Sequence, residues 1–182
     1  MKFTPTSIPE VQIIEPVLHE DERGFFMETY QAAIFADAGI DVSFVQENQS
    51  GSAQGTLRGL HYQIHQAQNK LVQVVSGEIF DVAVDIRRSS SSFGKWVGKV
   101  LSAENKQQMW IPTGFAHGFY VLSEWANVIY KVTDYYSPEW ERTLLWNDQE
   151  IGIDWSLNLE FPLLISKKDA AGVPLKFIET FK

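Results

Sequence analysis

Apolar and polar residues alternate with a period of two along much of the chain. In residues 79–86 the even-numbered positions are apolar, while Asp81 and Asp85 fall on the other face of an extended segment. Other short apolar segments predict strands over residues 10–18, 25–30, 115–122 and 127–132. Residues 31–38 are alanine-rich and predict one helix, with Gly39 placed to end it. Many short strands with one minor helix predict an all-β sandwich or barrel, in a single domain spanning residues 1–182.

Composition narrows the class of protein. The 182 residues suffice for a substantial core, and 45% of them are apolar. The net charge of −8 argues against a nucleic acid as partner but allows a small anionic ligand. The absence of cysteine excludes disulfides and thiol catalysis. The N-terminus shows no secretory signal and no apolar run approaches eighteen residues, so we expect a cytoplasmic protein with no membrane partner.

The segment Arg58–Gln63 concentrates side chains that can carry chemistry. If it is extended, His61 and Gln63 lie on one face with Gly59, and Arg58 lies on the other. Arg58 and His61 could then contact one ligand only if the strand bends or bulges near Gly59. The alternative is that Arg58 reaches a ligand at the rim of the barrel or at a subunit boundary.

Two histidines occur in contexts that resemble the two halves of the cupin signature. Gly55 precedes His61 by five intervening residues, and residues 112–117 read Pro-x-Gly-x-x-His, ending at His117. Metal-binding cupins continue the first half with a second histidine and then a glutamate. Here Gln63 takes the place of that histidine, and no glutamate follows within residues 64–68. Two imidazoles make a poor site for a divalent metal, so we predict no metal and leave His61 free for acid–base work.

Seven segments, in order, carry a more specific resemblance. They are DERGFFMETY (21–30), FVQENQS (44–50), GTLRGLHYQ (55–63), KLVQVVSGEIFDVAVDIRRSS (70–90), LSAENKQQMWIPTGFAHGF (101–119), YKVTDYYSP (130–138) and SKKDAAGVP (166–174). Together they make the chain similar to the dTDP-4-dehydrorhamnose 3,5-epimerases. This resemblance implies a cupin jelly roll (a double-stranded β-helix) with a few short peripheral helices. It also implies a homodimer that needs neither metal nor cofactor.

The resemblance also assigns roles to individual residues. His61 matches the general base, and Asp169 matches the carboxylate that orients it. Tyr130 matches the general acid on the opposite side of the sugar, and Lys70 matches the lysine near the reacting carbonyl oxygen. Tyr136 matches the aromatic residue that stacks on thymine. Further ligand-contacting positions match Arg23, Glu28, Gln46, Asn48, Arg58, His117, Glu141 and Lys168.

The chain departs from the family pattern at two positions. Gln49 stands where histidine is usual, and Asn69 stands where glycine is usual before the lysine. The second departure puts the geometry of the loop around Lys70 in question.

The implied substrate is a dTDP-linked 4-keto-6-deoxy sugar, in which C3 and C5 both lie alpha to the C4 ketone. A base with a pKa near neutrality, such as histidine, can remove either proton. A cation aimed at the enolate oxygen lowers the barrier further. We therefore expect epimerisation of dTDP-4-dehydro-6-deoxy-D-glucose at C3 and C5, feeding dTDP-L-rhamnose synthesis.

Three alternatives stay open from the sequence. The first is a mono-epimerase that inverts only C3 or C5. The second is a sugar-nucleotide-binding cupin without catalysis, which predicts loss of the base or the acid. The third, a metal-dependent cupin oxygenase, is disfavoured by Gln63 and the missing glutamate.

Overall fold

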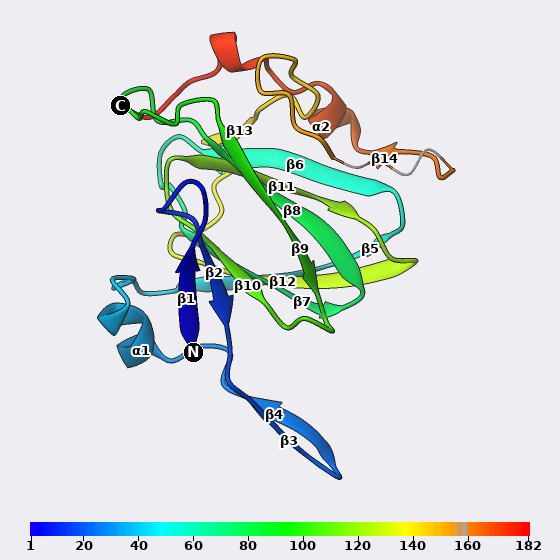
Figure 1. The fold of residues 1–182 in the computed structure, drawn as a ribbon. Coiled ribbons are helices and arrows are strands. Elements are labelled where there is room, and N and C mark those ends of the chain that lie inside the picture. The colour runs from blue at the N-terminus through cyan, green and yellow to red at the C-terminus, as the bar shows by residue number, and fades with distance from the viewer. Residues whose placement is uncertain (156, 158–159) are drawn as a thin grey trace.

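The computed structural model describes residues 1–155, 157 and 160–182, and these residues form two facing β-sheets and a separate hairpin (Figure 1). The first sheet, here called the β12 sheet, has the order β1 (Lys2–Pro5), β2 (Gln12–Glu15), β10 (Gln108–Ile111), β7 (Lys70–Ser76), β12 (Trp125–Val132) and β5 (Gln46–Ala53). The second, the β6 sheet, has the order β13 (Glu141–Thr143), β6 (Thr56–Gln63), β11 (Phe115–Val121), β8 (Glu78–Asp85) and β9 (Trp96–Ser102), with β14 (Leu164–Ile165) beside β6. This confirms the predicted all-β jelly roll.

Burial on both faces of β8 explains its sequence pattern. Val82 and Val84 pack in a cluster that the C-terminal segment covers, on the outer side of the β6 sheet. Ile79 and Ala83 point the other way, into the core between the two sheets. Asp81 shares their side of the strand and is fully buried. Alternate residues of β8 therefore pack in two different hydrophobic clusters, one on each face of the β6 sheet. The face that carries Asp81 is directed into the space between the sheets.

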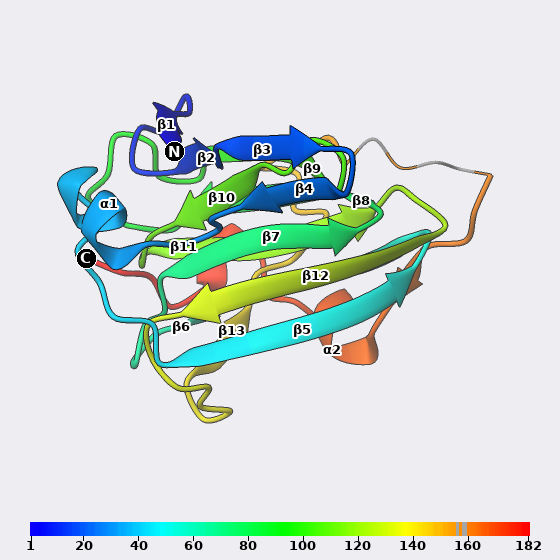
Figure 2. The ribbon, with the colours of Figure 1, turned by 90° about the horizontal axis from the view of Figure 1, so that it is seen from below.

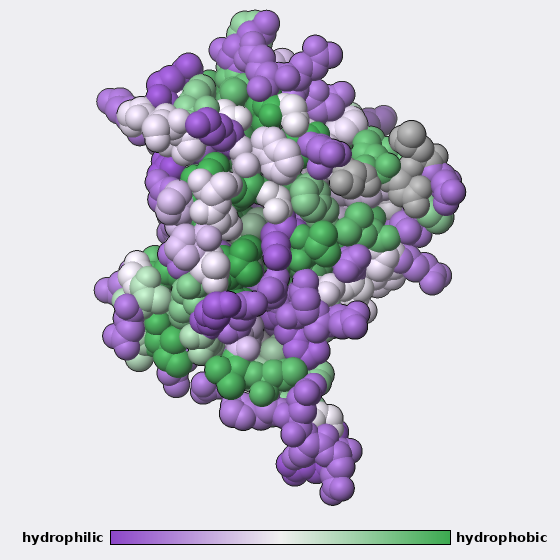
Figure 3. All heavy atoms as spheres, viewed as in Figure 1, coloured by the Kyte–Doolittle hydropathy of each residue, from purple (hydrophilic) through white to green (hydrophobic). Residues whose placement is uncertain are grey.

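The N-terminal region differs from the predicted elements. The expected strand 10–18 ends early, at Glu15, because Pro16 cannot donate to a ladder hydrogen bond. A new strand, β3 (Leu18–Asp21), then pairs with β4 (Gly24–Met27). Their hairpin projects from the body, and hydrophilic side chains cover its tip (Figures 1 and 3). The predicted helix is α1 (Ala32–Asp37), followed by Gly39 at a φ of +86°.

A bulge in β6 corrects the predicted orientation of Arg58. His117 pairs with His61 and Phe119 pairs with Arg58, so two steps along β11 match three along β6. Gly59 permits this close approach, since a Cβ there would lie 2.5 Å from the Cα of Gly118. As a result Arg58 lies on the same side of the sheet as His61 and both line one cavity. Of the two alternatives that the sequence left open, the structure therefore shows the bulge near Gly59, and the placement of Arg58 on the opposite face is wrong.

The C-terminal tail supplies two short helices, α2 (Lys167–Ala170) and the 3-10 helix η1 (Leu175–Phe177). Ser166 is the N-cap of α2, and its hydroxyl accepts the N–H of Asp169 at 3.0 Å. The cap therefore sets the position of Asp169 beside β6. In the part of the chain that the structure describes, no helix has the length and apolar character that a membrane span requires.

Candidate active site

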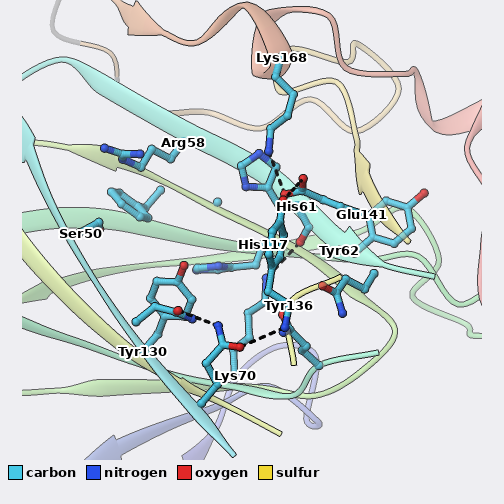
Figure 4. A pocket seen from close by; sticks show the side chains of 16 residues that line it. Ser50, Arg58, His61, Tyr62, Lys70, His117, Tyr130, Tyr136, Glu141 and Lys168 are labelled. Atoms are coloured by element: carbon cyan, nitrogen blue, oxygen red, sulfur yellow. Dashed lines mark hydrogen bonds and ion pairs between the residues drawn. The ribbon is translucent and has the colours of Figure 1, made fainter. Parts of the chain in front are cut away.

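A cavity of about 370 Å³ opens between the two sheets (Figure 4). It is lined by side chains from both sheets, from α2 and from the segment that follows β12. The predicted site residues that line it are Gln46, Asn48, Arg58, His61, Lys70, His117, Tyr130, Tyr136, Glu141 and Lys168. Figure 2 looks onto the outer face of the β12 sheet, where β7, β12 and β5 lie side by side in front of the β6 sheet.

His61 forms a partly buried pair with Asp169, as predicted. The Nε2 atom of His61 lies 2.7 Å from Oδ1 of Asp169, which is 3% exposed. Burial acts to raise the pKa of Asp169, but the His61 ring and the N–H of Gly59 outweigh it and hold this pKa below its ordinary value. The carboxylate is therefore ionised and accepts the hydrogen bond of the Nε2–H group, which leaves Nδ1 as the basic nitrogen.

A second histidine–aspartate pair lies next to the first. The Nε2 atom of His117 lies 2.7 Å from Oδ1 of Asp81, and His117 faces His61 across paired strands. Burial lowers the pKa of His117 even though Asp81 opposes the shift. Asp81 was not among the site residues predicted from the sequence. The signal that could have identified it was a carboxylate flanked on both sides by apolar residues in the middle of a strand.

Lys70 is the buried cation of the cavity. Its ammonium group donates to the carbonyl oxygen of His61 at 3.2 Å. Burial lowers its pKa to about 8, although Asp81 and Glu141 favour the charged form. Asn69, the departure from the family pattern, uses its side chain to bond Thr133 and Thr113, so the residue before Lys70 is tied to two neighbouring segments.

Tyr130 comes from the sheet opposite His61. It shares its strand face with Val128 and packs against the core between the sheets, as predicted. Burial raises the pKa of its phenol, so the hydroxyl stays protonated at neutral pH. In Figure 4 the Tyr130 and His61 side chains lie on opposite sides of the cavity.

A chain of polar contacts forms the mouth of the cavity. The hydroxyl of Tyr136 donates to Glu141 at 3.0 Å, and the ammonium of Lys168 donates to the same carboxylate at 2.8 Å. Gln46 accepts the backbone N–H of Tyr136 at 3.1 Å. Arg58 donates from Nε to Ser52 at 3.0 Å, and no described residue accepts a hydrogen bond from the terminal nitrogens of its guanidinium, which suit a bidentate anionic ligand.

A sequence model of the dTDP-4-dehydrorhamnose 3,5-epimerases matches residues 5–176. The chain belongs to this family. It is 60% identical to the dTDP-4-dehydrorhamnose 3,5-epimerase of Pseudomonas aeruginosa over 173 residues, which cover 94% of each chain.

Solved structures of the epimerase family share the fold. One is the dTDP-6-deoxy-D-glucose-3,5-epimerase of Legionella pneumophila, in complex with dTDP-4-keto-L-rhamnose. It is 53% identical, with a TM-score of 0.95, and the match covers 98% of this chain and 94% of that chain. A 3'-monoepimerase from Streptomyces bikiniensis, in complex with dTDP-quinovose, is 32% identical, with a TM-score of 0.88 over 95% of this chain and 87% of that chain.

Three of the residues matched to this epimerase family are not among those that line the cavity: Asp169, which is bonded to His61, and Arg23 and Glu28. Arg23 is in the turn of the β3–β4 hairpin, where it pairs with Asp21. Glu28 follows β4 and is exposed. Neither residue lines the cavity of its own chain.

Proposed function

We propose that the protein inverts C3 and C5 of dTDP-4-dehydro-6-deoxy-D-glucose to give dTDP-4-dehydro-L-rhamnose. One observation carries this proposal: His61, paired with Asp169 of α2, lies on the β6 sheet, and Tyr130 lies on the facing β12 sheet. A sugar ring held between the sheets has a base on one face and an acid on the other. Inversion of a carbon alpha to a ketone requires this arrangement.

Each inversion begins with removal of a proton. His61 takes the proton from the C–H bond through Nδ1, and the electron pair moves through the C3–C4 or C5–C4 bond onto the C4 oxygen. Asp169 stabilises the imidazolium that forms. Lys70 supplies a positive charge for the enolate oxygen, and the dry surroundings of its ammonium group strengthen that interaction.

Inversion is completed by proton donation from the other face. The enolate collapses to the ketone as the carbon takes the proton of the Tyr130 hydroxyl. The imidazolium then loses the proton it gained, and the phenolate regains one, before the next inversion. The raised pKa of Tyr130 favours this return to the phenol.

The nucleotide is assigned to the mouth of the cavity. Arg58 and Lys168 are cations that can bind the diphosphate. Tyr136, about half exposed, offers the face of its ring to the thymine base.

Deuterium exchange tests the reaction directly. The protein is incubated in D₂O with the 4-keto sugar nucleotide, and C3 and C5 are followed by NMR. We expect deuterium at both carbons, with inverted configuration at both. Incorporation at one carbon would replace the proposal with the mono-epimerase, and binding without incorporation would replace it with the non-catalytic cupin. The 60% identity to a 3,5-epimerase, against 32% to a monoepimerase, favours the double inversion.

We also propose that the protein acts as a homodimer. The strands of the β3–β4 hairpin are largely exposed, and Phe25 and Phe26 are 57% and 67% exposed. An isolated hairpin is marginally stable in water, and neighbouring exposed aromatic rings mark an interface. If the hairpin lies against a second copy, Arg23 and Glu28 can reach the partner's cavity.

A further inference from the structure

We propose that Gln63 is a positioning residue for nucleotide recognition. Its buried amide clamps the segment 135–137 and so fixes the ring of Tyr136 over the cavity mouth. This inference rests on the proposed function, in which Tyr136 stacks on the base of the nucleotide. It gives a role in the site to the residue that occupies the position of a metal-binding histidine in other cupins.

The contacts of Gln63 bracket Tyr136 on both sides. Gln63 is the last residue of β6 and is 5% exposed. Its Nε2 donates to the carbonyl oxygen of Tyr135 at 3.2 Å, and its Oε1 accepts the N–H of Ser137 at 2.8 Å. The second hydrogen on Nε2 goes to the carbonyl oxygen of Gln66 at 2.7 Å. One amide thus joins the loop after β6 to the segment after β12.

The clamped segment has no regular secondary structure to hold it. Residues 135–137 are in neither a helix nor a strand. Besides the two bonds from Gln63, the N–H of Tyr136 is held by Gln46. Three consecutive residues are therefore anchored by two glutamine side chains. Without the clamp, the segment would lose conformational freedom when a ligand binds, and that loss would weaken binding.

The chemistry of the clamp requires an amide. Gln63 must donate to two carbonyl oxygens and accept from one N–H, and among side chains only asparagine and glutamine offer both functions in this way. Leucine offers neither function. Glutamate keeps the acceptor for Ser137, but its carboxylate would face the carbonyl oxygens of Tyr135 and Gln66. When protonated it has one hydrogen to donate and can bond only one of the two.

The position of Gln63 also links the nucleotide to the chemistry. Gln63 lies two residues after His61 on the same strand, with both side chains directed into the cavity. The clamp therefore ties the aromatic ring to the strand that carries the base. We expect it to act on binding of the nucleoside diphosphate and to leave the proton transfers of bound substrate intact.

Calorimetry with dTDP tests the proposal. Gln63→Leu is expected to weaken dTDP binding about tenfold and to raise KM similarly, while kcat at saturation stays within about twofold. In the Tyr136→Ala background, Gln63→Leu should add less than a twofold loss, because both substitutions remove the same contribution. The proposal would be overturned if the affinity losses of the two single variants multiplied in the double variant. It would also be overturned if Gln63→Leu left dTDP affinity unchanged or lowered only kcat.

Gln63→Glu keeps the size of the side chain and carries the test if the leucine variant does not fold. Its dTDP affinity, relative to that of the unchanged protein, should recover in part as the pH falls, because the new carboxyl group gains one proton to donate. A pH-independent ratio would contradict the clamp. Gln54→Leu is the matched control, since its amide bonds the carbonyl of Leu122 away from the cavity and its loss should leave dTDP binding unchanged.

The two proposals fail in different ways. Binding of dTDP needs no turnover. Absence of deuterium exchange in the unchanged protein would therefore refute the epimerase reaction but not the clamp. Normal deuterium exchange in the unchanged protein, together with unaltered dTDP affinity in both Gln63 variants, would refute the clamp but not the epimerase reaction.

Discussion

Tyr130 and His61 face each other from different sheets. In the proposed reaction, proton removal and proton return are therefore carried out by two different residues. Tyr130→Phe removes only the proton donor of the second face. We expect inversion to fall at least ~100-fold, with a smaller fall in deuterium exchange, because His61 can still remove and return a proton on its own face. NMR of the product in D₂O measures both rates.

The matched control for this prediction is His61→Ala, which should abolish exchange and inversion together. If Tyr130→Phe lost both activities to the same extent, Tyr130 would not be the opposite-face acid.

Loss of the Lys70 charge should lower activity at alkaline pH. Its pKa is lowered to about 8 by burial, so the ammonium is charged below that pH and loses its charge above it. Stabilisation of the enolate by charge is lost in the same range, and we expect kcat/KM to fall as the pH rises past about 8. Tyr130 does not account for this fall, because its pKa lies above its ordinary value.

A pH–rate profile from 6 to 10 measures the effect, and Lys70→Met should lower kcat by about 10²–10³-fold and remove the limb near pH 8. A flat profile in the unchanged protein up to pH 9.5 would show that the Lys70 charge is not needed.

The side chains that line the cavity predict that chelators will not affect turnover. His61 and His117 each use Nε2 on an aspartate, and Gln63 uses its amide on backbone groups. In the described residues, no group of three or more metal-binding side chains was found. Dialysis against EDTA should therefore leave turnover unchanged, and inactivation that added metal reverses would refute the metal-free mechanism.

Helix α2 is the element that places the orienting carboxylate. It has four residues, too few to be stable alone, and the hydroxyl of Ser166 holds its first turn at the N–H of Asp169. Ser166→Ala should cost about 1 kcal/mol of unfolding free energy. It should also lower kcat about tenfold with little change in KM, because Asp169 would no longer be fixed against His61.

Thermal denaturation and steady-state kinetics measure the two effects of Ser166→Ala. Ser166→Thr, which keeps a capping hydroxyl, is the control and should restore both. A loss of stability with unchanged kcat would mean that the cap supports the fold but not the base.

At the scale of elements, the sequence located the strands whose periodicity is strong. The expectations for 79–86, 115–122 and 127–132 agree with β8, β11 and β12 to within two residues. The β3–β4 hairpin was not expected as a pair, because its strands are largely exposed and show no inward apolar face. The bulge in β6 could be posed only as an alternative, since the approach of Gly59 to Gly118 involves a strand far away in sequence.

At the scale of the whole molecule, the hairpin should report on assembly. Phe26→Ser removes an exposed apolar ring that makes no contribution to the buried core. We expect it to shift the protein from dimer toward monomer and to raise KM, because Arg23 and Glu28 would no longer reach the partner's cavity. Analytical ultracentrifugation with kinetics measures both.

Arg23→Ala is the control, and it should raise KM while the dimer persists. If Phe26→Ser left a monomeric protein with unchanged KM, the hairpin would have no part in the site.

The sequence by itself determined the fold class, the family and most of the cavity-lining side chains, because alternation and ordered motifs are local properties of the chain. The tertiary structure decided which groups meet. Asp169 reaches His61 across 108 positions, a contact that only the family resemblance implied, and the bulge at Gly59 turns Arg58 into the same cavity. Burial then selects Asp81 as the partner of His117 and lowers the pKa of Lys70. These features depend on contacts between distant segments and on exclusion of water, which strand periodicity does not encode.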